Sequence, residues 1–362
     1  MQTLAIETSC DDTSIGIISY DGETFNVEEL LAYSQIQDHQ KFWGVLPEIA
    51  SRLHSEKIIA ILQKIWRKKI EEVDLISVTT TPGLPGSLVV GKAVATMLSE
   101  YFHKPLLPVN HIHGHIFSIL LERKLSDLTF PLVILTASGG HNDIYLVTTP
   151  FMKGESEWNE QGDFQQLTET TENKEKISAF PFPFSIKKIG YTLDDASGEA
   201  FDKVSKMLWG PYPGGPRISQ QALNGKPNPE YQFKRIFLPK DENGNYLFSF
   251  SGMKSQVSFL LDKIKKSWKT LTEQDVADIA YEFQEATIET LANRLFKAVK
   301  EYEAATVAIA GGVSANNRLV EYITALTKKE NEHHPLKFIY PAKKIYSTDN
   351  WAMIGVVGFL NK

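Results

Sequence analysis

The chain has 362 residues, of which 42% are hydrophobic and 23% are charged, a balance that is typical of globular proteins and excludes a disordered one. The formal net charge is −6 at pH 7, whereas a protein that grips nucleic acid alone is more often basic. The single cysteine, Cys10, excludes an internal disulfide and a cysteine-rich zinc site, and it fits a reducing cytosol.

Length and the N-terminal sequence set two further expectations. A chain of this length exceeds one ordinary hydrophobic core, so we expect two lobes. The sequence holds no run of about 18 apolar residues, and its opening stretch, MQTLAIETSC, reads as a strand and not as a signal peptide. We therefore expect a cytoplasmic protein without a membrane span.

The first half of the chain opens with a hairpin and then alternates helices and strands. Residues 3–20, TLAIETSCDDTSIGIISY, read as an apolar strand, a polar turn and a second strand. The hydrophobic spacing next predicts a helix at 46–69, a strand at 74–81, a helix at 87–102 and a strand at 104–110. Residues 111–124 then have helical spacing, and Asn110 is suited to cap that helix.

The second half repeats this plan. Residues 130–147 again read as strand, glycine-rich turn and strand, and 272–302 predict a long helix capped by Thr272 with Asp275 three residues later. A strand at 305–312, a helix at 316–329, a strand at 336–341 and a capped helix at 347–361 complete the pattern. Such alternation is typical of the α/β class. Its duplication predicts two ribonuclease H-like (RNase H-like) lobes around a central cleft, the pattern of the actin-like ATPase (ASKHA) and sugar-kinase superfold.

We expect the lobes to divide the chain near residue 128. The N-terminal lobe takes residues 1–128, with 340–362 returning to it, and the C-terminal lobe takes 129–339. Residues 151–190 differ from both lobes, because they are polar, acidic and without periodicity, and the prolines of FPFPF exclude a helix. We interpret 151–190 as an exposed insertion.

A histidine cluster, NHIHGHIF at 110–117, is the most specific local feature. On a helix, His111 and His115 share one face while His113 points roughly the opposite way. The pair suits one metal ion, although a capped or packed histidine pair is an equally weighted alternative. Asp349 is a candidate third ligand, and taken alone it reads more readily as a helix N-cap. Ile112 stands where the H-E-x-x-H motif has its catalytic glutamate, so the motif does not support a metalloprotease.

Glycine loops and carboxylates are the other candidate functional groups. Four glycine-rich loops, at 81–87, 138–141, 212–216 and 310–317, flank predicted strands and would let a ligand approach the backbone. None of them matches the P-loop or the Rossmann pattern. Asp11 and Asp12 in the first turn are candidate catalytic groups, and Glu199 and Asp202 share a face if 197 onward is helical. For each carboxylate alone, a solvated surface position is the commoner alternative.

Ten segments in this order resemble one family. They are IETSCDDTS, GVLPEIASRLH, TPGLPGSLVVG, HIHGH, SGGHN, DDASGEAFDKVSKML, YPGGP, FSFSGMKS, AGGVSANNRL and STDNWAMI. They look like the successive signatures of the TsaD family, the tRNA N6-adenosine threonylcarbamoyltransferases. The resemblance covers nearly the whole chain except 151–190, and SGGH and GEAFDK look like the bacterial and organellar branch.

The resemblance implies a reaction and its participants. A threonylcarbamoyl group passes from threonylcarbamoyl-AMP to N6 of adenosine 37 in tRNAs that read ANN codons. One divalent ion, Fe²⁺ or Zn²⁺, falls on His111, His115 and Asp349. Binding of the adenylate falls on the following residues: Thr136, Ala137, Ser138, Gly139, Gly140, Asp202, Gly215 and Asn316. The implied partners are tRNA, a TsaB-like paralogous subunit and a TsaE-like ATPase, and a homodimer stays open.

Two departures from the family pattern and two other functions complete the expectations. The family usually has an acidic residue at His113 and a glycine at Trp351, and Trp351 could crowd the metal or stack on a ligand. The alternatives are an actin-like phosphotransferase or ATPase, and a non-catalytic scaffold paralogue. Retention of the three metal-ligand positions argues against the scaffold.

Overall fold

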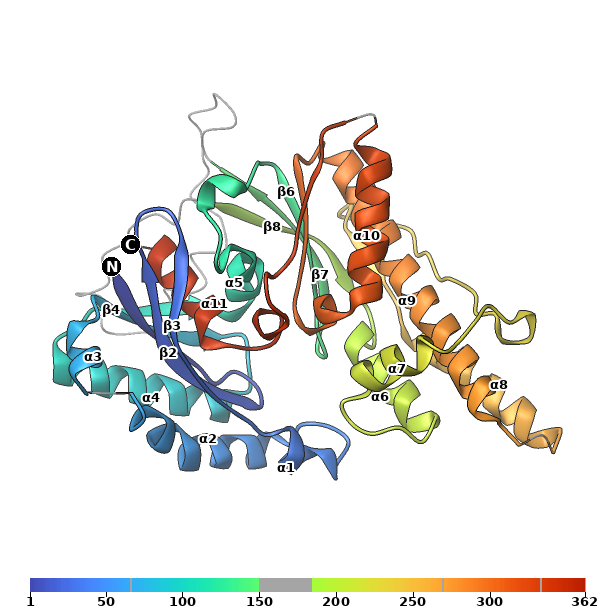
Figure 1. The fold of residues 1–362 in the computed structure, drawn as a ribbon, viewed down its shortest axis with the longest axis horizontal. Coiled ribbons are helices and arrows are strands. Elements are labelled where there is room, and N and C mark those ends of the chain that lie inside the picture. The colour runs from blue at the N-terminus through green and yellow to red at the C-terminus, as the bar shows by residue number, and fades with distance from the viewer. Residues whose placement is uncertain (66, 150–183, 269, 333, 362) are drawn as a thin grey trace.

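The computed structural model describes residues 1–65, 67–149, 184–268, 270–332 and 334–361, and it contains two β-sheets (Figure 1). The first sheet has the strand order β3-β2-β1-β4-β5. Its strands are β1 (Gln2–Glu7), β2 (Asp12–Tyr20), β3 (Phe25–Ser34), β4 (Leu75–Thr81) and β5 (Leu106–Asn110). β1, β2 and β3 pair antiparallel, whereas β4 and β5 continue parallel to β1.

The second sheet repeats this arrangement. Its order is β11-β10-β6-β7-β8-β9, with strands β6 (Leu132–Ala137), β7 (Asn142–Thr148), β8 (Ser185–Thr192), β9 (Tyr246–Phe248), β10 (Thr306–Ala310) and β11 (Lys337–Ile339). β6, β7 and β8 pair antiparallel, and β10 and β11 continue parallel to β6. Apart from β9 at one edge, the two sheets have the same strand order and directions, so the predicted duplicated α/β fold is confirmed.

Helices form three layers around the two sheets. Leu4 and Ile6 of β1 share a core with α2 (Pro47–Leu62) and α4 (Pro85–Phe102), whereas Ala5 between them faces the opposite core. That opposite core contains α5 (His111–Phe117) and α11 (Trp351–Leu360), and it also includes Ile134 of β6 and Ala308 of β10. α5 and α11 therefore lie between the sheets (Figure 1).

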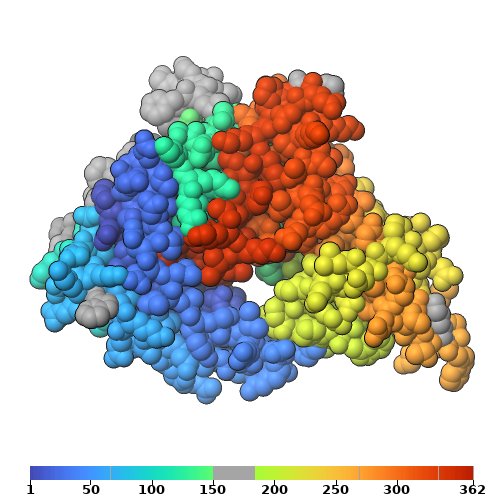
Figure 2. Space-filling view, in the orientation of Figure 1, coloured from blue at the N-terminus to red at the C-terminus, as the bar shows by residue number. Residues whose placement is uncertain are grey.

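The long helix α9 (Glu273–Glu301) shares the third core with the other face of β6. The remaining helices are α1 (Ile36–Gln40), α3 (Arg67–Glu72), α6 (Ser197–Met207), α7 (Gly214–Ala222), α8 (Ser251–Lys266) and α10 (Asn317–Glu330). Figure 2 shows the surface hollowed where the first lobe, in blue, faces α6 and α7, in yellow-green. The chain thus has a central cleft between the lobes.

Two predicted helices are shorter than the sequence indicated. The helix expected at 46–69 is divided, because α2 ends at Leu62 and α3 begins at Arg67. The turn between them buries Ile65, which is 4% exposed, so the hydrophobic spacing continues across a break in the helix. The helix expected at 111–124 ends at Phe117 and continues only as a 3-10 turn over Ser118–Leu120, where the Ser118 hydroxyl donates to the His115 carbonyl.

The predicted insertion 151–190 extends too far at its C-terminal end. Most of it lies outside the described residues, but Ser185–Thr192 form β8 and pair with β7. Ile189 lies at a register shift between the two strands, and this shift breaks the apolar alternation that would have indicated a strand. The boundary therefore lies before Ser185.

The predicted caps of α5 and α9 are confirmed. The Asn110 side chain accepts hydrogen bonds from the backbone N–H groups of Ile112 and His113, and Thr272 and Asp275 form a reciprocal capping box at the start of α9. Within the described part of the chain, none of the helices has the combination of length and apolar character that a bilayer crossing requires.

Candidate metal centre and the adjoining cleft

Helix α5 presents two histidines to the interior. Asn110 fixes the start of the helix at the end of β5, so His111 and His115 lie one turn apart on the same face. Their rings meet edge to face with centroids 4.6 Å apart. His111 is 7% exposed and His115 is 1% exposed, so both imidazoles are held in the protein and not in solvent.

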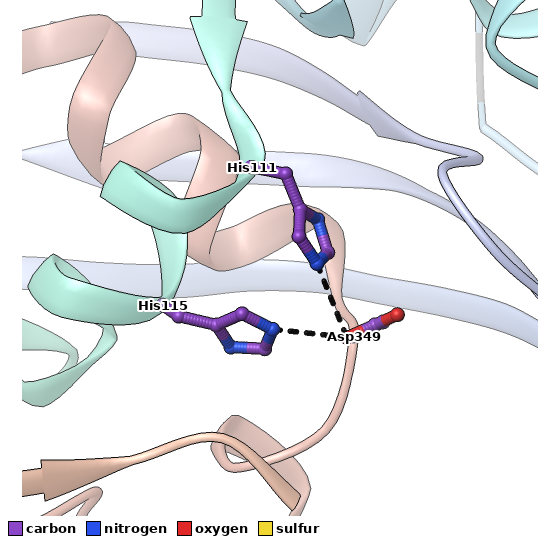
Figure 3. A group of neighbouring side chains, drawn as sticks. All are labelled: His111, His115 and Asp349. Atoms are coloured by element: carbon purple, nitrogen blue, oxygen red, sulfur yellow. Dashed lines mark ion pairs between the residues drawn. The ribbon is translucent and has the colours of Figure 1, made fainter. Parts of the chain in front are cut away.

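Asp349 completes the group from far along the chain. Its Oδ1 lies 3.1 Å from Nε2 of His115 and 3.6 Å from Nε2 of His111 (Figure 3). Asn350, and not Asp349, caps α11, since the Asn350 side chain accepts from the Met353 N–H at 3.1 Å. The alternative interpretation of Asp349 as an N-cap is therefore wrong, and its carboxylate is available to the histidines.

The three side chains fit one metal ion. Their donor atoms all lie within 4.8 Å of one another. Metal–ligand distances of about 2.0–2.1 Å place two ligands of a tetrahedral ion about 3.3 Å apart, and the two distances to Asp349 bracket that value. Two imidazoles and one carboxylate are donors that both zinc and iron(II) accept.

Gly114 explains why a glycine interrupts this helix. A Cβ at Gly114 would lie 2.9 Å from Cδ1 of Ile354 and 3.1 Å from Cγ of Met353. Both contacts are on α11, the helix that follows Asp349 directly. The missing side chain thus lets α5 approach α11 closely, and this approach brings the histidines to the carboxylate.

Glu7 orients His111 from behind. The Glu7 carboxylate is fully buried, accepts from the Ser9 N–H and the Thr79 hydroxyl, and lies 3.1 Å from Nδ1 of His111. A carboxylate on Nδ1 fixes the tautomer that leaves Nε2 free to bind a metal. Glu7 stands at the end of β1, so the first strand of the chain supports the centre.

The electrostatics of the group favour a cation. Burial lowers the pKa of His111, but the carboxylates of Asp349 and Glu7 outweigh burial and raise that pKa to about 9. Burial raises the pKa of Asp349, whereas His111 and His115 lower it more, so this carboxyl stays ionised. The buried carboxylate of Glu7 and the partly exposed one of Asp349 therefore attract positive charge to the two imidazoles, either a proton or a metal ion.

The two family departures lie outside this group. Trp351 is fully buried, and a Cβ on Gly16 of β2 would come within 2.3 Å of its ring. The indole therefore packs into the first sheet and does not crowd the metal donors, contrary to one expectation. His113 is not a member of the converging group, as its position on the opposite face of the helix predicts.

The second lobe reaches the centre through the loop between β6 and β7. The His141 ring lies 6.5 Å from the His115 ring, centroid to centroid, and its Nδ1 lies 2.6 Å from the Ser138 hydroxyl. Burial, and after it the neighbouring His115, lowers the pKa of His141. Since Thr136, Ala137, Ser138, Gly139 and Gly140 belong to the end of β6 and this loop, the predicted adenylate loop adjoins the metal centre.

The remaining predicted ligand contacts are joined to that loop by hydrogen bonds. The Gly198 N–H at the start of α6 donates to the Ser138 carbonyl, and Asp202, one turn later, accepts from the Gly214 N–H at the start of α7. Burial raises the pKa of Asp202 to about 6. Asn316 caps α10 and donates to Ser219 of α7.

The glycines of this surface leave room for a ligand. A Cβ built on Gly139, Gly140 or Gly215 would meet no atom within 4 Å. Open backbone beside the N–H groups of a helix start is the arrangement that anionic groups favour. The structure thus brings Asp202 and Gly215 together with 136–140 on one wall of the cleft, and Asn316 joins them through α7.

Asp11 and Asp12 lie on the opposite wall, where β1 turns into β2. Burial and then the charge of Asp349 raise the pKa of Asp11, so Asp11 is within electrostatic reach of the metal centre. Burial and then Asp11 raise the pKa of Asp12 to about 7. The Asp12 carboxyl is therefore suited to exchange a proton near neutral pH.

Sequence reasoning missed the contacts of three groups, although it counted Glu7 among the carboxylates that could act as a general base or bind a ribose. Glu7 carried no signal of its contact with His111, because that contact joins distant segments. His141 and Tyr212 belong to glycine-rich motifs, and only the glycines of these motifs were interpreted as ligand-binding features. Burial and then the charges of Asp11 and Asp202, which lie on opposite walls, raise the pKa of Tyr212, so this side chain is within electrostatic reach of both walls.

Known proteins similar to this chain point to one family. A family model described as tRNA N6-adenosine threonylcarbamoyltransferase (TsaD) matches residues 26–161 and 177–356. A relative of that name from Kosmotoga olearia is 37% identical over 362 residues, which is 99% of this chain and 93% of the relative. One from Bacillus subtilis is 36% identical over 363 residues, 99% of this chain and 90% of that relative.

Among solved structures, full-length HypF in its phosphate- and nucleotide-bound form is similar in fold. The match has a TM-score of 0.51 at 13% identity and covers 100% of this chain and 47% of the other. This likeness concerns the fold alone, and it agrees with the two matching sheets and the cleft described above.

Proposed function

The chain belongs to the TsaD family of tRNA N6-adenosine threonylcarbamoyltransferases, and we propose that it works with one divalent metal ion bound by His111, His115 and Asp349. It is an acyltransferase that transfers a threonylcarbamoyl group to N6 of an adenosine in tRNA. The observation that supports the metal proposal most directly is the convergence of two buried imidazoles and one carboxylate within 4.8 Å. Iron(II) and zinc both suit this donor set.

The acyl donor in this proposal is threonylcarbamoyl-AMP, a mixed anhydride. The N6 amine attacks the carbamoyl carbon, the bond from that carbon to the phosphate oxygen breaks, AMP leaves, and the amine loses one proton. When bound, the metal supplies Lewis-acid stabilisation of negative charge beside the cleft. The protein's own contribution is to hold the adenylate and to place the adenosine against it.

Residues 136–140 hold the phosphate in this proposal. Gly139 and Gly140 of this loop leave open space beside the backbone, and Gly215 at the start of α7 does the same. Asp202 and Asn316 contact the sugar or base of the adenylate from the same wall. Support comes from the hydrogen bonds that link Ser138, Gly198, Asp202 and Gly214 into one surface.

Asp11 and Asp12 are the proposed acceptors of the amine proton. They face the adenylate wall across the cleft, and Tyr212 is within electrostatic reach of both sides. A carboxylate whose pKa is about 7, as for Asp12, accepts a proton more readily than an ordinary one. Because AMP is a good leaving group, loss of either carboxylate should slow the reaction without abolishing it.

Reconstitution with the partner proteins tests the proposal. The wild-type chain, tRNA, ATP and the TsaB-like and TsaE-like proteins are combined with preformed threonylcarbamoyl-AMP, and they should yield threonylcarbamoyladenosine by nucleoside mass spectrometry. His111→Ala and Asp349→Ala should abolish the product and lower the bound metal, with the circular-dichroism spectrum unchanged. His113→Ala, on the same helix but outside the metal group, is the matched control and should keep both.

Two results would contradict the proposal in different ways. Full activity of His111→Ala and Asp349→Ala would exclude the metal assignment but not the transferase. ATP consumption that is independent of tRNA and phosphorylates a small substrate would instead favour an actin-like phosphotransferase.

We also propose that the paralogous subunit binds the outer face of α4. That face carries four residues spaced four apart: Val89, Ala93, Met97 and Tyr101. The side chains are well exposed, at 58% for Val89, 51% for Met97 and 59% for Tyr101. A continuous apolar stripe on an outer helix is typical of a protein interface. A partner built on the same lobe plan would offer an equivalent helix to cover it.

A further inference from the structure

A basic hollow on the second lobe shares no residue with the metal centre or the cleft. It has a volume of about 650 Å³ and lies between residues 237–240 and the second half of α9, with Tyr246 of β9 at one side. Its cationic lining residues are Lys240, Arg294, Lys297 and Lys300, and no acidic residue of the described ranges lines it. Such a concentration of one sign of charge creates a positive potential in the hollow.

Arg294 is the buried member of this set. Arg294 is only 5% exposed. One of its guanidinium nitrogens donates to the Leu238 carbonyl, and the guanidinium lies 5.6 Å from the centre of the Phe237 ring. Its Nε has no hydrogen-bond partner within the described ranges. Burial lowers the pKa of Arg294, yet a guanidinium stays charged in proteins. A buried charge of this kind is costly unless an anion compensates it.

The lysines differ in how far their charge is already neutralised. Lys240 pairs with Glu301, which also accepts from the Tyr246 hydroxyl. Lys300 lies 3.0 Å from Glu330. For Arg294 and Lys297, the parts of the chain that the structure describes supply no carboxylate partner within 4 Å. Two cations of the hollow therefore stay uncompensated, one deep in its wall and one exposed.

We propose that this hollow binds a phosphate group, either of a nucleic acid backbone or of a free nucleotide. The guanidinium N–H groups of Arg294 that Leu238 leaves free can donate to the anion while the Lys297 ammonium neutralises its charge. Phe237 lines the same hollow and is 47% exposed, so its ring offers a face to a base or sugar. This site is additional to the adenylate wall of the cleft and does not depend on it.

Lys297→Glu tests the proposal without disturbing the core, because Lys297 is exposed. Two probes separate the two sources of phosphate. Inorganic pyrophosphate is titrated calorimetrically into the metal-loaded protein, and fluorescent tRNA is titrated over a range of salt concentrations by anisotropy. Lys265→Glu is the matched control, since Lys265 is an exposed lysine on α8 that does not line the hollow.

If the ligand is a free phosphate, wild type should bind pyrophosphate at one more site than Lys297→Glu does. A nucleic acid ligand predicts that Lys297→Glu binds tRNA on the order of tenfold more weakly and with a shallower salt dependence. Arg294→Lys keeps the charge but loses the guanidinium, and it should weaken binding of the same probe. If Lys297→Glu and the control bind both probes as wild type does, Arg294 serves only to hold residues 237–240 and the proposal is overturned.

Discussion

At the scale of single residues, the contact between Glu7 and His111 shows how one buried carboxylate prepares a metal ligand. Glu7 accepts from two fixed donors and faces Nδ1 of His111. Its orientation is therefore fixed by β1 and β4, and it passes that orientation on to the imidazole. No local pattern in the sequence contains this information, because the two residues belong to segments that meet only in the folded chain.

Glu7→Gln should weaken metal binding by about 10- to 100-fold, since a supporting carboxylate contributes about that much to the affinity of a histidine ligand. The measurement is competition with a chelator on zinc-reloaded protein, independent of any turnover. Thr79→Ser, which keeps the hydroxyl that donates to Glu7, is the control and should bind metal nearly as wild type does. Unchanged affinity of Glu7→Gln would mean that His111 is oriented by packing alone.

Asp202 gives a second prediction, on pH. Its pKa in the folded chain is about 6, above the ordinary value of 3.8 for an aspartate, so the folded state binds the proton more tightly than the unfolded state. Stability from this group is complete below pH 4 and is lost as the pH rises to about 6. The loss is at most about 1.4 kcal/mol for each pH unit.

Asp202→Asn keeps an acceptor for the Gly214 N–H and cannot ionise, so it should not show this loss. Melting temperatures measured from pH 4 to pH 8 on the metal-free protein should diverge in favour of the variant as the pH rises. Glu199→Gln on the same helix controls for the change in helix charge. Parallel curves for wild type and Asp202→Asn would show that burial does not perturb this carboxyl.

At the scale of elements, the short helix α5 depends on its contact with α11. A helix of this length is unstable on its own, and Gly114 weakens it by about 1 kcal/mol more relative to alanine. Packing against Met353 and Ile354 through the missing side chain compensates for both. Gly114 interrupts the helical pattern, and it is the point at which α5 contacts α11.

Gly114→Val should lower stability by about 1–3 kcal/mol, because the added methyl groups overpack the contact with α11. It should also weaken metal binding, since α5 must move away from Asp349. Gly114→Ala is the graded control, in which a gain in helix propensity offsets a tight contact with the flexible end of Ile354. Thermal melting measures the change in stability, and chelator competition measures the change in metal affinity. Unaltered metal affinity in Gly114→Val would show that close packing of α5 on α11 does not position the metal ligands.

The same scale shows what the sequence could and could not predict. Both opening hairpins, the caps at Asn110 and Thr272, and the helical pairing of His111 with His115 follow from local spacing. The third strand of each sheet, β3 and β8, was not predicted. Each of them is shifted in register against its neighbour, at Ile17/Ile18 and Ile144/Tyr145, and a bulge removes the alternation on which strand prediction depends. The convergence of Glu7, His141 and Asp349 on one centre is a property of the tertiary fold and has no local signal.

At the scale of the whole molecule, the two lobes divide the chemistry. The first lobe supplies the metal donors and the carboxylates Asp11 and Asp12, whereas the second supplies the loop at 136–140 and the surface around Asp202. The outer face of α4, on the first lobe, takes part in neither role and carries the apolar stripe proposed to bind the partner.

Met97→Asp should therefore reduce affinity for the TsaB-like partner by about tenfold or more, because a charge would replace an apolar side chain in the centre of the interface. Sedimentation or calorimetry with the purified partner measures it. Met97→Leu should bind normally, and the metal content of both variants should equal that of wild type. Wild-type affinity in Met97→Asp would place the partner on another surface.

The position of α11 between the two sheets has a consequence for how the protein is made. During translation the histidines of α5 leave the ribosome long before Asp349 and the helix that follows it. Until α11 docks, Ala5 of β1 and Ile18 of β2 lack the apolar neighbours that this helix supplies, and the histidines lack their carboxylate. Metal retention therefore marks a chain that has been synthesised through its last helix. A nascent or prematurely terminated product, with no ion and an exposed apolar layer, is expected to be a substrate for chaperones and quality-control proteases.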